Sequence, residues 1–188
     1  LDELVEEVGV DATRFWMLMR SADTTIDFDV DLAKSQTDKN PVFYVQYAHA
    51  RACSILRKAT EKRLDVDNKT ELPPYLTKEE IDNFNKNPNI LPMFENLSDE
   101  QMEAVKSLIL KLEEGKVLLY NAVKYRAPYM VCKYLMELAN NFHHFYNYTR
   151  VLSDDKNDSL MKLSLVNCFR IVMAKMLDLI GVSQVEKM

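Results

Sequence analysis

The spacing of apolar residues predicts helices along most of the chain. The first expected helix covers residues 2–8 and is closed by Gly9, since glycine is favoured just past a helix end. Asp11 is expected to cap a second helix over residues 12–19. In residues 22–30, apolar and acidic side chains alternate as in a strand, but the sequence offers no evident partner strand. We therefore interpret this stretch as an extended connector.

A long helix is predicted to begin at Pro41 and to reach about Arg63. Asn40 is a good capping residue, and proline is favoured in the first helical turn. The expected buried stripe of this helix consists of Val45, Ala48, His49, Ala52, Leu56 and Ala59. A second face, about 120° round the helix, is aromatic and cationic and carries Tyr44, Tyr47, Arg51 and Lys58. This second face is separate from the expected core.

The middle of the chain is predicted to be less regular. Prolines among polar residues mark residues 65–97 as a loop or insertion, with at most one short helix near residues 78–84. Ser98 and Gln101 then form a capping box, the usual start of a helix. We expect that helix to reach Glu114, where Gly115 ends or bends it before another helix from Lys116 to about Arg126.

Two more long helices complete the prediction. Pro128 is expected to open one that reaches about Leu152, and the last should run from about Asn157 to Ile180, where Gly181 stops it. The core stripe of the first is Val131, Leu135, Leu138, Phe142, Phe145, Thr149 and Leu152, and its flank carries His143, Tyr146, Asn147 and Arg150. Long helices with short connections predict an all-α fold, an antiparallel helical bundle.

Composition agrees with a folded domain. The chain has 188 residues, 47% of them apolar, and a formal net charge of −5. Its longest apolar runs have four or five residues, whereas a membrane-spanning helix needs about 20. Cys53, Cys132 and Cys168 lie far apart on apolar stretches, so we expect reduced core residues and a cytoplasmic location. A start at Leu1 without Met indicates a piece of a longer protein.

Charge is distributed unevenly along the sequence. Residues 41–64 and 105–152 each carry a net charge of +4, and together they hold eleven of the eighteen aromatic residues. Basic side chains interleaved with aromatic ones can bind a nucleic acid that offers phosphates and unstacked bases. The alternative is that the aromatic rings fill a helical core and the lysines coat its outside. Composition alone leaves both interpretations open.

The residues needed for catalysis are missing from the sequence. It contains no glycine-rich phosphate loop and no Gly-x-Ser-x-Gly elbow. None of the three histidines has a Glu three residues before it, as a di-iron bundle would require. We expect His49 to be a core or boundary residue, and His143 and His144 to lie at the surface. We therefore predict no catalytic residue, no metal ligand and no enzymatic activity of this chain alone.

Four strings in order carry a family resemblance: GVDATRF at residues 9–15, DFD at 27–29, NPVFYVQYAHAR at 40–51 and FHHFYN at 142–147. Together with the ending GVSQVEKM at 181–188, they make the sequence resemble the C-terminal part of arginyl-tRNA synthetases. The resemblance covers about 150 residues of the chain. Its most specific element is YVQYAHAR at residues 44–51.

The resemblance implies a division into two parts. Residues 1–36 correspond to the connector that follows a class I catalytic domain, which is absent. Residues 37–188 correspond to an all-helical anticodon-binding domain of the DALR type, with the insertion at 65–97. The implied function is to bind the anticodon arm of tRNA(Arg) and to position it for ATP-dependent attachment of arginine by the catalytic domain of the same polypeptide. ATP and Mg²⁺ would belong to that parent enzyme, with no cofactor in this chain, and neither DNA nor a membrane is an expected partner.

The resemblance also implies a set of binding residues. The family's anticodon contacts fall on Asn40, Tyr44, Tyr47, Tyr146, Arg150 and Met188. We expect Arg51, Lys58, Lys124, Arg126, Lys133 and Arg150 to neutralise phosphates. Tyr120, Tyr125 and Tyr134 are instead interpreted as rings packed between helices. A helical scaffold that binds a protein partner through the same tyrosine-rich faces is the alternative function.

Overall fold

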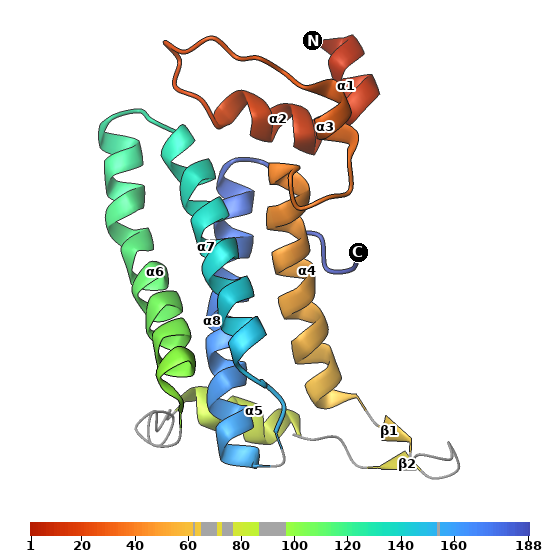
Figure 1. Ribbon diagram of the computed structural model, residues 1–188, viewed down its shortest axis with the longest axis vertical. Helices are drawn as coiled ribbons and strands as arrows, with labels where there is room; N and C mark the ends of the chain where they lie inside the picture. Colours follow the sequence, from red (N-terminus) through yellow and green to blue (C-terminus); the bar gives the residue numbers. More distant parts are fainter. Residues whose placement is uncertain (62, 65–70, 73–76, 87–96, 154) are drawn as a thin grey trace.

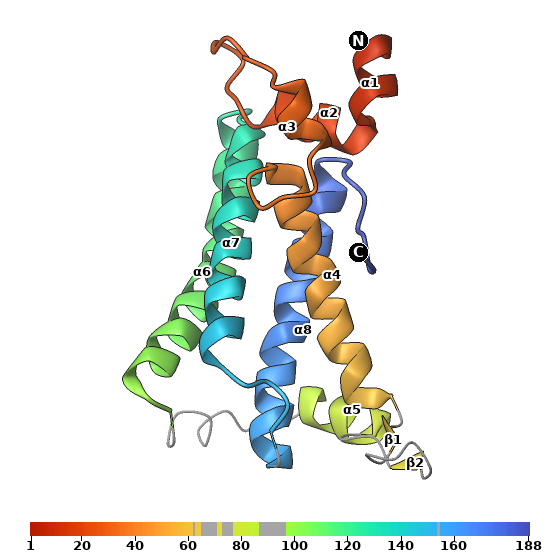
Figure 2. The same ribbon diagram turned by 45° about the vertical axis from the view of Figure 1, so that its right-hand side comes forward.

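Four long helices lie side by side in the computed structural model, which describes residues 1–61, 63–64, 71–72, 77–86, 97–153 and 155–188. They are α4 (Pro41–Thr60), α6 (Asp99–Lys124), α7 (Tyr129–Tyr148) and α8 (Lys156–Leu179). In Figures 1 and 2, α6 and α7 form an antiparallel pair, and α8 runs opposite to both α7 and α4. The prediction of an all-α helical bundle is confirmed.

The two ends of the bundle are covered by shorter elements. At one end lie α1 (Asp2–Val8), α2 (Val10–Leu18) and α3 (Val30–Lys34), and at the other lies α5 (Lys78–Lys86). Beside α5, β1 (Arg63–Leu64) pairs antiparallel with β2 (Glu71–Leu72). The short helix expected near residues 78–84 is therefore confirmed, whereas the small hairpin was not predicted. The rest of the expected insertion, residues 65–70, 73–76 and 87–96, lies outside the described residues.

The core is built from the apolar stripes of the long helices. Val45, Ala48 and Ala52 of α4 are fully buried, as are Leu135, Leu138, Phe142 and Phe145 of α7. The rings of Phe142 and Phe169 stack with centroids 3.9 Å apart and 8° between their planes, joining α7 to α8. The buried stripes on both helices thus agree with the prediction, except that Leu56 and Leu152 are only partly buried.

Several predicted helix boundaries are wrong. Helix α2 begins at Val10 directly after Gly9, so Asp11 lies inside its first turn and does not cap it. Helix α3 was not expected; the carboxylate of Asp29 caps it by accepting a hydrogen bond from the amide of Leu32 at 2.9 Å. Helix α4 stops at Thr60, and Arg63 belongs to β1. Helix α7 ends at Tyr148, four residues before the expected end.

Gly115 does not end a helix. It lies inside α6, which is continuous over 26 residues from the predicted capping box at Ser98 and Gln101. A Cβ atom at position 115 would lie 2.9 Å from the hydroxyl oxygen of Tyr134. Glycine is therefore needed there for close packing of α6 against α7.

The cysteine and tyrosine predictions hold only in part. Cys132 is buried and Cys53 partly buried, but Cys168 is exposed, because it lies on the solvent side of α8. Tyr134 is 1% exposed, as predicted, and its hydroxyl donates a hydrogen bond to the carbonyl oxygen of Lys111 at 3.0 Å. Tyr120 and Tyr125 are 66% and 64% exposed, so their interpretation as packed rings is wrong. Among the described residues, no helix is both long enough and apolar enough to cross a membrane.

Candidate nucleic-acid interface

The aromatic and cationic face predicted for α4 lies opposite the flank of α7. Asn40 fixes the start of α4: its side-chain oxygen accepts from the amide of Val42 at 3.3 Å, and its amide nitrogen donates to the carbonyl oxygens of Ala33 and Ser35 at 2.9 and 2.8 Å. From this start, helical spacing places Tyr44, Tyr47 and Arg51 on the side that faces α7.

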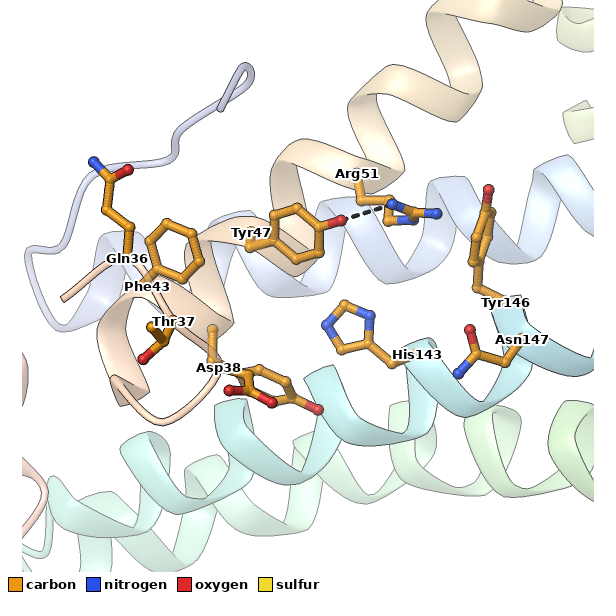
Figure 3. A pocket seen from close by; sticks show the side chains of 10 residues that line it. Gln36, Thr37, Asp38, Phe43, Tyr47, Arg51, His143, Tyr146 and Asn147 are labelled. Carbon is orange, nitrogen blue, oxygen red and sulfur yellow. Dashed lines mark hydrogen bonds between the residues drawn. The ribbon is translucent and has the colours of Figure 1, made fainter.

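Arg51 joins aromatic rings from the two helices, as Figure 3 shows. Its guanidinium donates a hydrogen bond to the hydroxyl of Tyr47 at 2.7 Å, and its Cζ atom lies 4.1 Å from the ring centroid of Tyr146. The ring of Phe43 stacks against Tyr47 with centroids 6.1 Å apart and planes 10° from parallel. Hydrogen bonding and cation–π attraction therefore hold these rings in fixed positions.

His143 lies between the tyrosines, although sequence reasoning placed it at the surface and did not select it. Its ring centroid is 5.0 Å from that of Tyr44 and 5.8 Å from that of Tyr47. Burial, and to a lesser extent the nearby charge of Arg51, lowers the pKa of His143 below its ordinary value of 6.5. Its Nε2 atom is buried without a hydrogen-bond partner. The imidazole is therefore neutral at neutral pH.

Three hollows adjoin one another through shared lining residues, and we call them together the α4–α7 groove. The first has a volume of about 440 Å³ and is lined by Gln36, Thr37, Asp38, Phe43, Tyr44, Tyr47, Arg51, His143, Tyr146 and Asn147. The second, of about 410 Å³, shares Tyr47, Arg51 and Tyr146 with it and adds Lys58 and the chain end, Glu186 to Met188. The third, of about 530 Å³, shares Lys58 and Tyr146 with the second and reaches Arg150.

Most of the predicted contact residues meet in this groove. Tyr44, Tyr47, Arg51, Lys58, Tyr146, Arg150 and Met188 all line it. Asn40 does not, because it is 3% exposed and its side chain is occupied by the start of α4. Sequence reasoning missed Phe43 and residues 36–38, whose only signal was proximity to the aromatic helix face.

The other predicted phosphate contacts lie elsewhere. Lys124, Arg126 and Lys133 line none of the three hollows of the groove: Lys124 ends α6, Arg126 lies in the turn that follows, and Lys133 belongs to the second turn of α7, at the connector end of the bundle (Figure 1). The ammonium of Lys124 lies 5.8 Å and 5.4 Å from the ring centroids of Tyr120 and Tyr125. Lys124 therefore lies beside exposed aromatic rings outside the groove.

The groove is suited to binding flat, anionic ligands. Five cationic side chains and two carboxylates line it, together with exposed tyrosine edges. Desolvation by burial, and then the charge of Asp38, raises the pKa of Tyr44, so its hydroxyl remains a hydrogen-bond donor. Within the described part of the chain, no group of three or more His, Cys, Asp or Glu side chains could hold a metal ion.

Comparison with known proteins gives a consistent result. The family model described as the DALR anticodon binding domain matches residues 45–188. The chain is 41% identical over its full length to the arginine–tRNA ligase of Desulforamulus reducens and 43% identical to that of Symbiobacterium thermophilum, of which it covers 29% and 30%. It matches the arginyl-tRNA synthetase structure of Thermus thermophilus with a TM-score of 0.67 and 30% identity, over all of this chain and 28% of that one.

A helical bundle with an aromatic and cationic groove defines a binding module. The chain belongs to the family of DALR anticodon-binding domains and is homologous to the C-terminal region of arginyl-tRNA synthetases. It spans about 30% of the length of the curated relatives it matches.

Proposed function

We propose that this chain binds the anticodon arm of tRNA(Arg) in the α4–α7 groove. The observation that carries the proposal is the cluster of Arg51, Tyr47 and Tyr146, which presents two fixed rings from different helices to one hollow. The single-stranded anticodon loop can splay its bases onto such rings, with each stacked base contributing about 1–3 kcal/mol. Membership of an anticodon-binding family supports this choice of ligand.

The proposed roles of the remaining residues follow from their positions. Tyr44, Tyr47 and Tyr146 offer rings to bases, and Met188 borders the second hollow. Lys58 and Arg150 are placed to neutralise phosphates along the groove. Asn40 contributes by fixing the start of α4. Lys124, Arg126 and Lys133 can reach only RNA that extends beyond the groove to the α6–α7 turn, so their contribution is smaller.

The proposal extends to the longer protein of which this chain would be a part. That protein would be an arginine–tRNA ligase whose catalytic domain, with ATP and Mg²⁺, attaches arginine to the tRNA that this domain positions. Residues 1–36 would be the connector to that domain. Neither DNA nor a membrane enters the proposed function, and we expect the cytoplasm as its location. On its own, this chain should catalyse neither arginine-dependent ATP/pyrophosphate exchange nor aminoacylation.

Two substitutions on α4 test whether Tyr47 belongs to the binding site and Ala52 to the core. Tyr47→Ala should weaken binding of an arginine-accepting tRNA by about 1–3 kcal/mol, one stacked base. It should lower the melting temperature by no more than about 5 °C, since 1 kcal/mol corresponds to ~2–4 °C at this chain length. Ala52→Asp should do the reverse, because Ala52 is fully buried and an unpaired carboxylate there costs several kcal/mol.

Filter binding and thermal melts on three variants distinguish the possibilities. Tyr146→Ala on α7 should behave like Tyr47→Ala, because both rings line the same hollow. A tRNA that accepts another amino acid serves as the control ligand. If Tyr47→Ala melts the protein and leaves tRNA binding intact, the ring belongs to the core. If wild-type protein ignores tRNA and holds a protein partner in the presence of ribonuclease, the interaction-module alternative replaces the proposal.

A further inference from the structure

The segment after α8 crosses from the connector end of the bundle to the groove. Gly181 has a φ of 66° and turns the chain, with the amide of Val182 donating to the carbonyl oxygen of Leu177 at 3.0 Å. The guanidinium of Arg14 in α2 donates a hydrogen bond to the carbonyl oxygen of Gly181. The C-terminal tail, residues 182–188, therefore begins in contact with the connector.

Asp11 forms a junction between the connector, α4 and this tail. One carboxylate oxygen accepts from the amide and the hydroxyl of Ser183 at 3.0 and 3.2 Å. The other accepts from the side-chain amide of Gln46 at 2.8 Å, and that amide also donates to the carbonyl oxygen of Ser183 at 3.1 Å. Gln46 is 8% exposed, so its donors have little access to water. Each of the three segments thus holds the other two.

Beyond the junction, the tail follows α4 into the groove. Nδ1 of His49, which is 2% exposed, lies 2.9 Å from the carbonyl oxygen of Val185. Glu186, Lys187 and Met188 then line the second hollow together with Tyr47 and Tyr146. Asp11 itself lines none of the three hollows, although the wall formed by these last residues depends on where the tail lies.

We propose that Asp11 is a positioning residue for RNA binding: through Ser183 and Gln46 it holds the C-terminal tail as a wall of the α4–α7 groove. This inference rests on the proposed function. Val182 is buried and Val185 partly buried, but Ser183, Gln184 and residues 186–188 are exposed, so apolar burial holds the tail at two of its seven residues. Without the junction the tail loses its hydrogen bonds at Ser183 and gains conformational freedom between Gly181 and the His49–Val185 contact, and the apparent affinity for RNA falls with the fraction of molecules whose wall is in place.

Whether Asp11→Ala weakens or strengthens RNA binding separates the positioning role from a general effect of net charge. Removal of a carboxylate makes the chain less negative, which by itself strengthens attraction to a polyanion. The junction predicts the opposite, because Asp11→Ala frees the wall. Glu6→Ala is the matched control: Glu6 is an exposed acid of the connector, its loss changes the net charge equally, and it takes no part in the tail's hydrogen bonds to Asp11, Gln46 and His49.

Two measurements on the same variants test the proposal. Asp11→Ala should weaken binding of the anticodon stem-loop of an arginine-accepting tRNA by about three- to tenfold. Hydrogen–deuterium exchange of residues 182–188, measured without RNA, should rise in the same variant, whereas Glu6→Ala should leave both quantities unchanged or strengthen binding slightly. Gln46→Leu removes the other side of the junction and should repeat the result if Asp11→Ala folds poorly.

A chain that ends at Gln184 completes a double-mutant cycle. It lacks the wall, so Asp11→Ala should weaken RNA binding no further in this background. Three results would overturn the positioning role. One is a further loss of RNA binding when Asp11→Ala is added to the shortened chain. The others are faster exchange of the tail in Asp11→Ala with unchanged RNA affinity, and unchanged exchange of the tail in that variant. If the wild-type chain binds no RNA, the proposed function fails. The exchange data then decide separately whether Asp11 holds the tail.

Discussion

Arg51 determines how the groove presents its rings. Sequence reasoning assigned it to a phosphate, but its guanidinium already donates to Tyr47 and lies over Tyr146. Because a planar guanidinium can stack and donate at the same time, it fixes two rings that the backbone alone leaves free to rotate. We therefore interpret Arg51 first as the residue that orients the tyrosines and only second as a cation for RNA.

His143 predicts a pH dependence of stability. Since burial and Arg51 lower its pKa in the folded chain, the unfolded chain takes up a proton first as the pH falls below about 6.5. Proton uptake favours the unfolded chain, so the free energy of unfolding decreases as the pH falls from the unfolded-state pKa towards the lower folded-state pKa. Denaturant melts at pH 7.5 and 5.5 should show a smaller loss for His143→Gln than for wild type.

The neighbouring histidine provides the control for this measurement. His144 is exposed on the same helix, so His144→Gln should keep the wild-type loss of stability. Equal losses in wild type and His143→Gln would contradict the buried, neutral imidazole that the structure places between Tyr44 and Tyr47.

The cysteines predict a clear order of alkylation. Burial raises the pKa of Cys132 to about 12, so it has almost no thiolate at pH 8 and little access to reagent. Cys168 is exposed on α8. Native protein treated with iodoacetamide should be modified at Cys168 first, with Cys132 reacting only after unfolding. Peptide mapping by mass spectrometry measures the order, and early modification of Cys132 would contradict the packing of α7.

At the level of helices, local sequence signals predicted which segments are helical better than they predicted where each helix begins and ends. The capping box at Ser98, the cap at Asn40 and the helix stop at Gly181 were predicted correctly because these signals act within a few residues. Gly115 was misread, because its reason for being glycine is the hydroxyl of Tyr134 on another helix. Asp11 was misread for the same reason: its partners, Gln46 and Ser183, are distant in sequence.

The close packing at Gly115 predicts that alanine destabilises the protein at this position, although alanine is the better helix former. Alanine is about 1 kcal/mol better than glycine inside a helix, yet Gly115→Ala should destabilise the protein by roughly 1–3 kcal/mol because its Cβ meets Tyr134. Tyr134→Phe removes the hydroxyl. In a chain that carries this substitution, Gly115→Ala should lower the free energy of unfolding by less than half as much. Urea melts of the four proteins in this cycle measure the coupling, and additive effects would show that the two residues are independent.

For the whole molecule, the groove is formed by segments that no local pattern connects. The face of α4 could be predicted because Tyr44, Tyr47 and Arg51 follow helical spacing. Spacing also grouped Tyr146 and Arg150 on one flank of the helix predicted at α7, but it could not show that this flank faces α4 or that the tail crosses α4, since both depend on how the helices pack. The family resemblance supplied Tyr146, Arg150 and Met188 as binding residues, whereas His143 and Phe43 required the structure.

Charge on the scale of the molecule predicts weak RNA binding that depends strongly on salt. The chain carries a net charge of −5, so long-range attraction to RNA is small, and contact depends on the few cations of the groove. Arg57 pairs with Glu61 at 3.2 Å, which leaves Arg51, Lys58, Arg150 and Lys187 as the groove cations without an ion pair among the described residues. With about four phosphates neutralised at roughly −0.7 each, log K should fall with log salt at a slope of about −3.

Titrations of a tRNA anticodon stem-loop at several salt concentrations give this slope, and single variants assign it. Lys58→Gln should reduce the slope by about 0.7, because it removes one phosphate contact, and should weaken binding equally for every tRNA. Tyr47→Ala should leave the slope unchanged while lowering affinity, since stacking on a neutral ring releases no counterions. Lys78→Gln on α5 is the control, because this exposed lysine lines none of the groove's hollows. A wild-type slope near zero would contradict phosphate contact in the groove, and an equal change for Lys78→Gln would show that the RNA senses only net charge.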